Sequence, residues 1–190
     1  MNALILVIIL AIVEGITEFL PVSSTGHMIL VNKLIGGEYL SPTFTNSFLI
    51  IIQLGAILSV VVYFWKDLTP FVGTKEKFVL RFRLWVKIIV GVIPAMVIGL
   101  FLDDIIDKYF MDNVTTISIT LIVYGIIFIA IEVIYKIKNV KARVRKFSEL
   151  KYGTAFLIGF FQCLAMIPGT SRSGATIIGA LLLGLSRPLA

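Results

Sequence analysis

Residues 3–27 read ALILVIILAIVEGITEFLPVSSTGH, an apolar run that two carboxylates interrupt before it reaches a proline and a string of polar residues. A helix that crosses the hydrocarbon core of a bilayer needs about 20 predominantly apolar residues. Neither side of Pro21 supplies such a run without interruption, and the apolar stretch after the polar string is especially short. The pattern therefore predicts a re-entrant helical hairpin over residues 1–35, with its polar tip just after Pro21.

A second stretch of the chain repeats this design. Apolar residues flank PGTSRSGAT at 168–176 on both sides, so a second re-entrant hairpin is expected over residues 153–185. When Pro21 is laid on Pro168, both copies read apolar-Pro-x-[Ser/Thr]-Ser. Non-helical backbone at membrane depth is tolerated only where protein or a water-filled cavity satisfies its polar groups. We expect both tips to line such a cavity; an internal duplication without function is the alternative.

Three uncharged apolar runs between the hairpins are long enough to cross a membrane, namely residues 44–65, 84–102 and 115–135. An odd number of crossings inverts the second hairpin relative to the first, and the broken helices of inverted repeats meet near the bilayer midplane. The sequence predicts an all-α polytopic membrane protein with a single transmembrane domain over residues 1–190. Its two re-entrant hairpins form an inverted-topology repeat whose tips meet near the midplane.

The composition agrees with a protein that faces lipid. The 190 residues are 58% hydrophobic and 15% charged, whereas soluble domains have about 45–50% apolar and about 25% charged residues. The mean hydropathy is +1.03. The glycines and prolines have no period, and a single cysteine cannot form an intrachain disulfide. Collagen-like, disordered and disulfide-scaffold classes are therefore excluded.

The net charge of +6 indicates membrane sidedness, and no nucleic-acid partner is expected, because the basic residues gather in two segments. Residues 66–87 hold six basic and two acidic groups, and residues 136–151 hold seven basic groups and one acidic group. Such basic loops lie on the cytoplasmic side of a membrane. The segment 103–114, with four aspartates and one lysine, should lie outside. The first hairpin then enters from outside and the second from inside.

Two carboxylates precede the first tip. Glu14 and Glu18 are four residues apart, so they share one face of a helix. A carboxylate at membrane depth costs about 2.5 kcal/mol or more on insertion scales. A shared proton, a cation or a basic partner must compensate this cost, unless the pair lies at a hydrated helix end.

Hydroxyl residues stand where the second helix of each hairpin is expected to begin. Ser23 or Ser24 in the first copy, and Thr170 or Ser171 in the second, occupy N-cap positions. Helix N-termini bind anions, above all phosphates. Arg172 adds a planar guanidinium that can hold two phosphate oxygens. The alternative for this arginine is a structural pair with a neighbouring acid.

Carboxylates and an anion site in one cavity repel each other unless a divalent cation bridges them. We therefore expect Mg²⁺ or Ca²⁺ between Glu14, Glu18 and a phosphate. This combination indicates phosphoryl chemistry, in which a serine hydroxyl or a water attacks while His27 or a glutamate moves the proton. Whether Ser24 or water is the nucleophile stays open from the residues.

The candidate site residues fall into two groups. The expected catalytic residues are Glu14, Glu18, Ser24, His27 and Arg172, with the two glutamates as metal ligands. The expected phosphate-binding residues are Ser23, Thr25, Gly26, Gln53, Gly169, Thr170, Ser171, Ser173 and Thr176. Gln53 lies in the middle of an apolar span, where an interhelical hydrogen bond is an equally good explanation.

Three motifs resemble those of a known family. EGITEFLPVSSTGH at 14–27, IIQLGAILSVV at 51–61 and PGTSRSGAT at 168–176 are similar to the bacterial undecaprenyl pyrophosphate phosphatases, also called bacitracin-resistance proteins. The resemblance implies hydrolysis of undecaprenyl pyrophosphate to the monophosphate carrier of peptidoglycan synthesis, with a divalent cation. It also implies a place in the bacterial cytoplasmic (inner) membrane with the active site facing outside.

The same resemblance assigns roles to residues. The family's acidic motif falls on Glu14 and Glu18, its serine and histidine on Ser24 and His27, and its phosphate-binding motif on Ser171, Arg172, Ser173 and Thr176. Family members continue past the position of residue 190 with further spans. We therefore expect a C-terminally truncated chain with an incomplete second repeat, whose missing surface a homodimer could supply.

Two other classes of function compete with the enzyme. A polyprenyl-phosphate or anion transporter would use the same midplane site, because inverted repeats with broken helices are typical of transporters. A structural or anchoring membrane protein ranks last, since it leaves the intramembrane charges without a purpose. Release of phosphate from a prenyl pyrophosphate separates the enzyme from the transporter.

Overall fold

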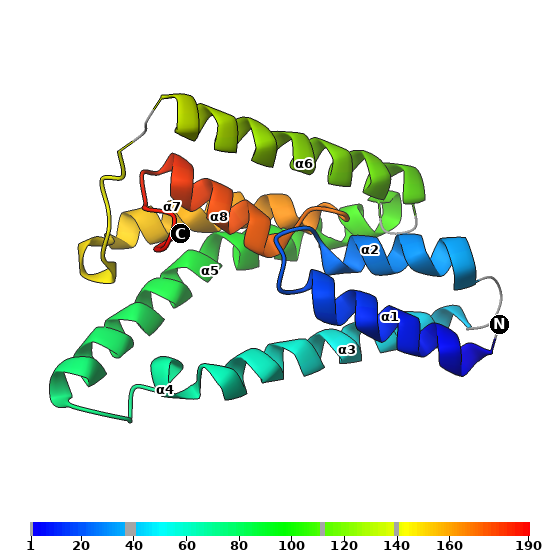
Figure 1. Cartoon of the computed structure of the whole chain (residues 1–190), viewed down its shortest axis with the longest axis horizontal. Coiled ribbons are helices and arrows are strands. Elements are labelled where there is room, and N and C mark those ends of the chain that lie inside the picture. The colour runs from blue at the N-terminus through cyan, green and yellow to red at the C-terminus, as the bar shows by residue number, and fades with distance from the viewer. Residues whose placement is uncertain (1, 37–40, 111–112, 139–140) are drawn as a thin grey trace.

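The computed structural model describes residues 2–36, 41–110, 113–138 and 141–190, and within them the chain is helical with no β-strand. Its elements follow the order of the chain (Figure 1). They are α1 (Ala3–Thr17), α2 (Ser24–Val31), the π-helical turn η1 (Asn32–Gly36), α3 (Pro42–Tyr63), α4 (Trp65–Leu68), α5 (Lys75–Phe110), α6 (Val114–Ile137), the 3₁₀ turn η2 (Phe147–Glu149), α7 (Tyr152–Cys163), the 3₁₀ turn η3 (Leu164–Met166) and α8 (Arg172–Leu182).

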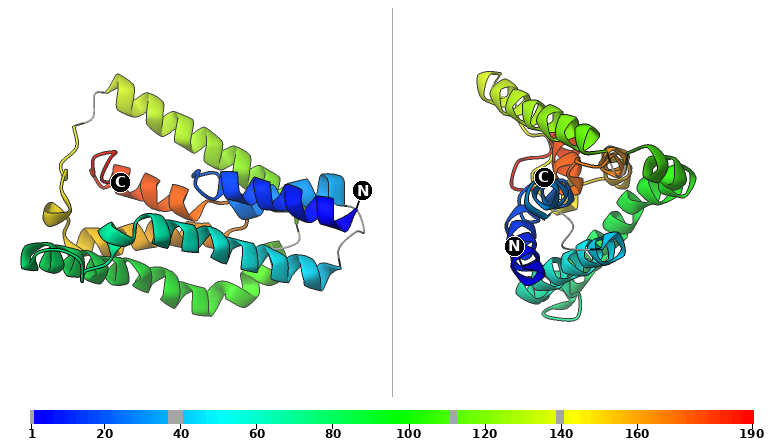
Figure 2. Two further views of the ribbon diagram at one scale, coloured as in Figure 1. Left: turned by 60° about the horizontal axis from the view of Figure 1, so that its bottom comes forward. Right: turned by 90° about the vertical axis from the view of Figure 1, so that its right-hand side faces the viewer.

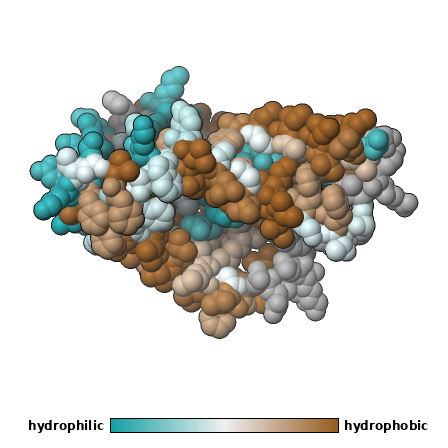
Figure 3. Space-filling view, turned by 90° about the horizontal axis from the view of Figure 1, so that it is seen from below, coloured by the Kyte–Doolittle hydropathy of each residue, from teal (hydrophilic) through white to brown (hydrophobic). Residues whose placement is uncertain are grey.

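Three helices are long and apolar enough to cross a membrane: Thr43–Tyr63 in α3, Lys75–Leu102 in α5 and Val114–Ile137 in α6. Most of their large apolar side chains are exposed, so their surface suits lipid and not water. The predicted all-α fold with three membrane-length helices is confirmed. Figure 3 shows a largely hydrophobic surface on one face of the molecule, with the hydrophilic residues gathered at one end.

Helix α5 differs from the predicted span 84–102 because it is much longer. It begins at Lys75, directly after the Gly73–Thr74 turn, and it continues to Phe110. The basic segment at its start contains lysine, glutamate, arginine and leucine, which favour helix. Parts of both predicted loops, 66–87 and 103–114, are therefore helical.

The two predicted hairpins are helix pairs that approach each other from opposite ends of the molecule (Figure 1). Helices α1 and α2 form the first pair, and α7 and α8 form the second. Their tips touch where glycine removes the side chain: a Cβ atom on Gly26 would lie 3.2 Å from the Cα of Gly169. In the same way, a Cβ on Gly174 would lie 3.1 Å from the carbonyl oxygen of Pro21. The backbones of the two tips therefore meet directly.

Helix α6 supports the second tip. The Thr120 hydroxyl donates a hydrogen bond to the carbonyl oxygen of Pro168 at 2.7 Å. Gly169 has φ +90, a left-handed conformation that glycine adopts without strain. A Cβ there would overlap the Thr120 hydroxyl and would lie 2.8 Å from the carbonyl oxygen of Ile117. Only glycine fits between α6 and this turn.

Helices α5 and α7 form the most extensive packing between two helices of the described chain, and they run side by side in both views of Figure 2. A Cβ on Gly159 would overlap the carbonyl oxygen of Gly91 and lie 3.0 Å from Pro94 Cδ. Small residues that allow close backbone approach are the usual basis of helix association in membranes. This contact anchors the second hairpin to α5.

The first hairpin has a separate apolar core. Leu6 and Leu10 of α1 and Met28 of α2 are fully buried, and Phe48, Leu49 and Ile52 of α3 pack against them. This cluster holds the hairpin on α3. The first hairpin thus packs on α3 and also contacts α6, whereas the second packs mainly on α5.

Replacement of Gly159 by alanine should lower the thermal unfolding midpoint of the purified protein in detergent, because the added methyl group meets backbone atoms of α5. Overpacking of this kind costs about 1–3 kcal/mol. The matched control is Gly153→Ala in the same helix, where an added Cβ would have no neighbour within 4 Å. Alanine favours helix over glycine, so the control should unfold at the wild-type temperature or slightly above it. Equal midpoints for the two variants would contradict the described packing of α5 on α7.

Candidate functional site

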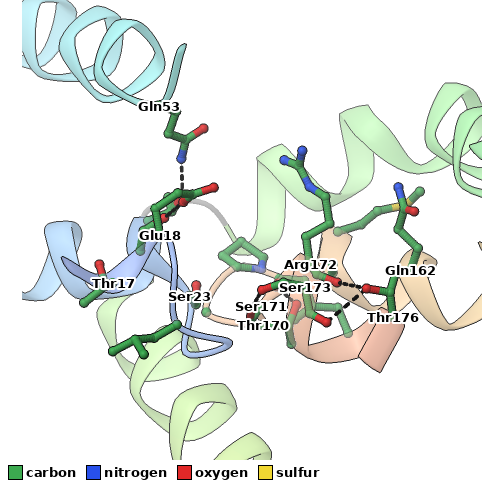
Figure 4. A pocket seen from close by; sticks show the side chains of 18 of the residues that line it. Thr17, Glu18, Ser23, Gln53, Gln162, Thr170, Ser171, Arg172, Ser173 and Thr176 are labelled. Atoms are coloured by element: carbon green, nitrogen blue, oxygen red, sulfur yellow. Dashed lines mark hydrogen bonds between the residues drawn. The ribbon is translucent and has the colours of Figure 1, made fainter. Parts of the chain in front are cut away.

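The touching tips enclose a cavity of about 430 Å³, to which α3 adds part of the wall (Figure 4). Polar side chains come from both hairpins and from α3. They are Thr17, Glu18, Ser23, Ser24, Thr25, Gln53, Gln162, Thr170, Ser171, Arg172, Ser173 and Thr176. Of the predicted site residues, Glu14, Gly26 and His27 are not part of this wall, whereas the other eleven line it.

The first tip is a strained turn that starts α2. Ser23, one of the two predicted candidates, is the N-cap, and its hydroxyl accepts a hydrogen bond from the backbone N–H of Gly26 at 3.3 Å. Ser23 has φ +66, and no other non-glycine residue of the described ranges has a positive φ. Such strain persists only where the surrounding structure enforces it, and it is frequent at functional sites. The turn places Ser24 at the first position of α2, inside the cavity.

Glu18 and Ser24 are in direct contact. The Ser24 hydroxyl donates a short hydrogen bond to Glu18 Oε2, and the serine is buried. A hydroxyl becomes a competent nucleophile when an adjacent base can take its proton. This pair meets that geometric requirement, and it selects Glu18 over Glu14 as the carboxylate next to the serine.

Glu14 lies one turn before Glu18 and is only 2% exposed. Its Oε1 atom is buried and has no hydrogen-bond partner among the described residues. A buried carboxylate oxygen without a partner is costly unless a proton or a cation satisfies it. Glu14 is therefore a buried carboxylate with an unsatisfied oxygen, one helical turn before the cavity residue Glu18.

His27 is half-buried on α2 and is held by the strained turn. Its Nδ1 lies 2.8 Å from the carbonyl oxygen of Ser23. A carbonyl oxygen can only accept, so Nδ1 carries the proton in this hydrogen bond, and Nε2 of the neutral ring keeps its lone pair. Gly26, next to it, serves the contact between the two tips and not the cavity wall.

The second tip presents the N-terminus of α8 to the cavity. Ser171, and not the other candidate Thr170, is the N-cap. Its hydroxyl accepts a hydrogen bond from the backbone N–H of Gly174 at 3.1 Å and lies 3.0 Å from the Ser173 hydroxyl. The Thr170 hydroxyl donates to the carbonyl oxygen of Leu164 at 2.7 Å, so it stabilises the turn. The start of the helix and the two serine hydroxyls together form a site suited to an anion.

Arg172 lies at the first position of α8, and its side chain is exposed to the cavity (Figure 4). Among the described residues the one ion pair joins Arg187 to Glu132 at 2.7 Å. Arg172 therefore has no acidic partner in the described part of the chain, and the alternative role, a structural ion pair, is not supported there. Its guanidinium is available to a phosphate.

Both roles predicted for Gln53, an interhelical hydrogen bond and a place in the cavity wall, are observed. Its amide donates to the Thr25 hydroxyl at 2.6 Å, an interhelical hydrogen bond between α3 and α2, and both residues line the cavity. Thr17 and Gln162 also line the cavity, although neither was among the predicted site residues. Gln162 is the only amide in the apolar part of the second hairpin. An amide within an apolar segment was the reason for selecting Gln53, and the same criterion would have identified Gln162.

A metal site made by protein ligands alone is absent from the described residues, in which no group of three or more histidine, cysteine, aspartate or glutamate side chains lies close together. Glu14 and Glu18 offer two carboxylates. Mg²⁺ is commonly bound by one or two carboxylates, with waters and substrate phosphates completing its shell. The unsatisfied Oε1 of Glu14 fits such a partial site.

These features define a class: a multi-pass α-helical membrane protein with a polar cavity that combines a carboxylate paired with a serine and a free arginine, and with a second, buried carboxylate one helical turn before the first. The family model described as bacitracin resistance protein BacA matches residues 7–190. The chain belongs to this family, as the sequence motifs predicted.

Curated relatives cover nearly all of the chain. It is 83% identical over 185 residues to an undecaprenyl-diphosphatase of Fusobacterium nucleatum, which spans 97% of this chain and 70% of that protein. It is 52% identical to undecaprenyl-diphosphatase 1 of Clostridioides difficile and 49% identical to an undecaprenyl-diphosphatase of Streptococcus mutans, in each case over 96% of this chain and 65% of the relative. The chain thus spans about two thirds of the length of these relatives.

Binding of methylenediphosphonate, a diphosphate analogue that cannot be hydrolysed, should depend on Arg172. The Arg172→Gln variant should bind it at least about tenfold more weakly than the wild type, because hydrogen bonds to charged groups contribute about 1.5–3 kcal/mol. Isothermal titration calorimetry measures the affinity. Arg187→Gln is the control, since this arginine pairs with Glu132 at the surface. Equal affinity of Arg172→Gln and wild type would remove Arg172 from the anion site.

Proposed function

We propose that this chain carries the active site of an undecaprenyl-diphosphatase, which hydrolyses undecaprenyl diphosphate to undecaprenyl phosphate and inorganic phosphate. The observation that carries the proposal is the cavity in which a carboxylate–serine pair from one hairpin faces a free arginine and a helix N-terminus from the other. The names of its relatives at 83% and 52% identity support the same activity. The reaction returns the lipid carrier to peptidoglycan synthesis and underlies bacitracin resistance.

The membrane setting follows from the arrangement of the helices. We propose that the α1–α2 and α7–α8 pairs are re-entrant hairpins of an inverted repeat, with their tips near the midplane of the bacterial cytoplasmic membrane. Three membrane-length helices separate the two pairs, and the tips meet from opposite ends of the molecule (Figure 1). The two basic segments lie at the same end, which suits a cytoplasmic side there and an active site that opens outward.

The geometry supports Ser24 as the nucleophile. The terminal phosphate of the substrate binds at the N-terminus of α8, where Arg172 neutralises charge on its oxygens. Ser24 Oγ forms a bond to the terminal phosphorus and passes its proton to Glu18 Oε2. The bond from that phosphorus to the bridging oxygen breaks, and undecaprenyl phosphate leaves. Water then hydrolyses the phosphoserine, which releases inorganic phosphate and restores the serine. His27 Nε2 is the second group able to accept a proton near this turn.

A divalent cation, Mg²⁺ or Ca²⁺, fits the carboxylate pair. Glu14 and Glu18 would hold it together with phosphate oxygens, which would satisfy the buried Oε1 of Glu14. When bound, such an ion neutralises charge on the phosphate oxygens. The cation remains a proposal that rests on these two carboxylates, and the homodimer likewise stays a prediction.

The transporter alternative has no specific observation in its favour. The paired Glu18 and Ser24 have a direct use in bond cleavage, whereas a binding site that only moves its ligand does not need an activated hydroxyl. The relatives carry the name of a phosphatase and not that of a carrier.

Purified protein should release inorganic phosphate from undecaprenyl diphosphate or farnesyl diphosphate, and Ser24→Ala should lower this rate by about 10²–10⁴, the range expected for loss of an activated group. Acid quenching during turnover, followed by mass spectrometry, should find phosphate on Ser24. Ser118→Ala is the control, because that hydroxyl donates to a backbone carbonyl of α6 and lines no described cavity. Normal turnover without phosphoserine would assign the attack to water.

Chelation of divalent cations should abolish phosphate release, and added Mg²⁺ or Ca²⁺ should restore it. Glu14→Gln should raise the metal concentration needed for half-maximal activity by about tenfold or more, since it removes one charged ligand. Glu132→Gln, which changes an exposed glutamate paired with Arg187, should leave the metal dependence unchanged. Full activity of the wild type in the presence of a chelator would exclude the cation.

A further inference from the structure

We propose that an apolar cavity beside the phosphate site binds the first isoprene units of the prenyl chain. This cavity has a volume of about 270 Å³ and lies between α5, α7, α8 and the end of the chain. Its wall includes Val92 of α5, Ile158 of α7 and Ala180 of α8. The inference rests on the proposed function. It assigns a binding site to the prenyl chain of the substrate, next to the site proposed for its diphosphate.

The two cavities are neighbours with a common wall. Gln162 of α7 and Thr176 of α8 line both of them, and Figure 4 shows these two side chains beside Arg172 and Ser173. The Thr176 hydroxyl is already used within α8, where it donates to the carbonyl oxygens of Arg172 and Ser173 at 3.1 and 3.0 Å. Gln162 is therefore the polar group at the junction that can serve a ligand.

The order of groups along the two cavities matches the order of groups in a prenyl diphosphate. Ser24 and Arg172 lie in the polar cavity, where the terminal phosphate is cleaved. Gln162 lies at the junction, where its amide can donate to the inner phosphate that stays on the product. The apolar cavity follows, where the hydrocarbon begins.

The side chains of the apolar cavity offer no free charge to a ligand. Its one charged residue is Lys87, which is buried, and its Nζ donates to the carbonyl oxygen of Phe147 at 2.7 Å. The same ammonium group lies 5.8 Å from the centroid of the Tyr152 ring. Lys87 therefore joins α5 to the loop before α7, and its charge is already engaged there. The remaining wall is mostly aliphatic, which suits an uncharged hydrocarbon.

Two residues of the cavity wall are exposed on α5, a helix long and apolar enough to cross a membrane. Val92 is 41% exposed and Ile88 is 42% exposed, although both line the cavity. A chain that enters between them can leave the protein again and continue into the bilayer. The site therefore needs to hold only the first units of a long prenyl chain, and its modest volume is sufficient for that.

Obstruction of this opening tests the inference. Val92→Trp should raise KM for farnesyl diphosphate about tenfold, because displacing two CH₂ groups from an apolar site already costs about that factor in affinity. The same variant should hydrolyse isopentenyl diphosphate, which carries a single isoprene unit, within about twofold of the wild-type rate. Val97→Trp is the matched control: Val97 lies on α5, is 45% exposed and lines no described cavity.

A second pair of variants guards against local misfolding. Ile88→Trp should repeat the effect of Val92→Trp, and Ile93→Trp, at a position 37% exposed and outside the described cavities, should not. Thermal unfolding midpoints establish that all four variants are folded. If the wild type hydrolyses neither substrate, the proposed function fails. If the wild type hydrolyses farnesyl diphosphate and the cavity variants keep the KM values of their controls, the prenyl site is overturned while the phosphatase stands.

Discussion

The contact between two glycine backbones, Gly26 and Gly169, determines where every functional group of this protein can lie. Gly26 lies in the first turn of α2, and Gly169 lies in the turn before α8. A side chain on Gly26 would press on the second tip, and a side chain on Gly169 would collide with α6. The polar groups freed by the turns need partners there. The N-cap serines and the Thr120 hydroxyl of α6 supply some of them. The cavity is the remaining space that this contact encloses.

Much of this arrangement could be predicted from the sequence because it depends on local chemistry. The lengths of the apolar runs predicted three membrane-length helices. The hydroxyl residues after each proline predicted two N-cap candidates in each hairpin, and the N-caps are Ser23 and Ser171. The pairing of the two proline motifs predicted that Glu18 and Arg172 belong to one cavity, and both line it. Periodicity and capping act over a few residues, so a single sequence reveals them.

Other features depend on distances that a sequence does not contain. The sequence alone does not distinguish Glu14 from Glu18, because both precede the first tip on the same helix face. Only Glu18 contacts Ser24, because the turn after α1 brings the serine back against the end of the helix. The displacement of His27 from the cavity wall has the same origin, since its ring is held by the carbonyl of Ser23. The early start of α5 was missed for another reason: a charged amphipathic helix and a charged loop have similar composition.

The division of the cavity between two distant hairpins has a consequence for biosynthesis. A ribosome that has made the first 150 residues has delivered the glutamates and Ser24 to the membrane but has not yet made Arg172. Before the second hairpin is made, the glutamates of the first hairpin lie in the membrane without the arginine of the site. The insertion machinery or neighbouring helices can supply temporary partners for them. Under the proposed function, cleavage therefore cannot begin before the α7–α8 hairpin has been made and has docked against the α1–α2 hairpin.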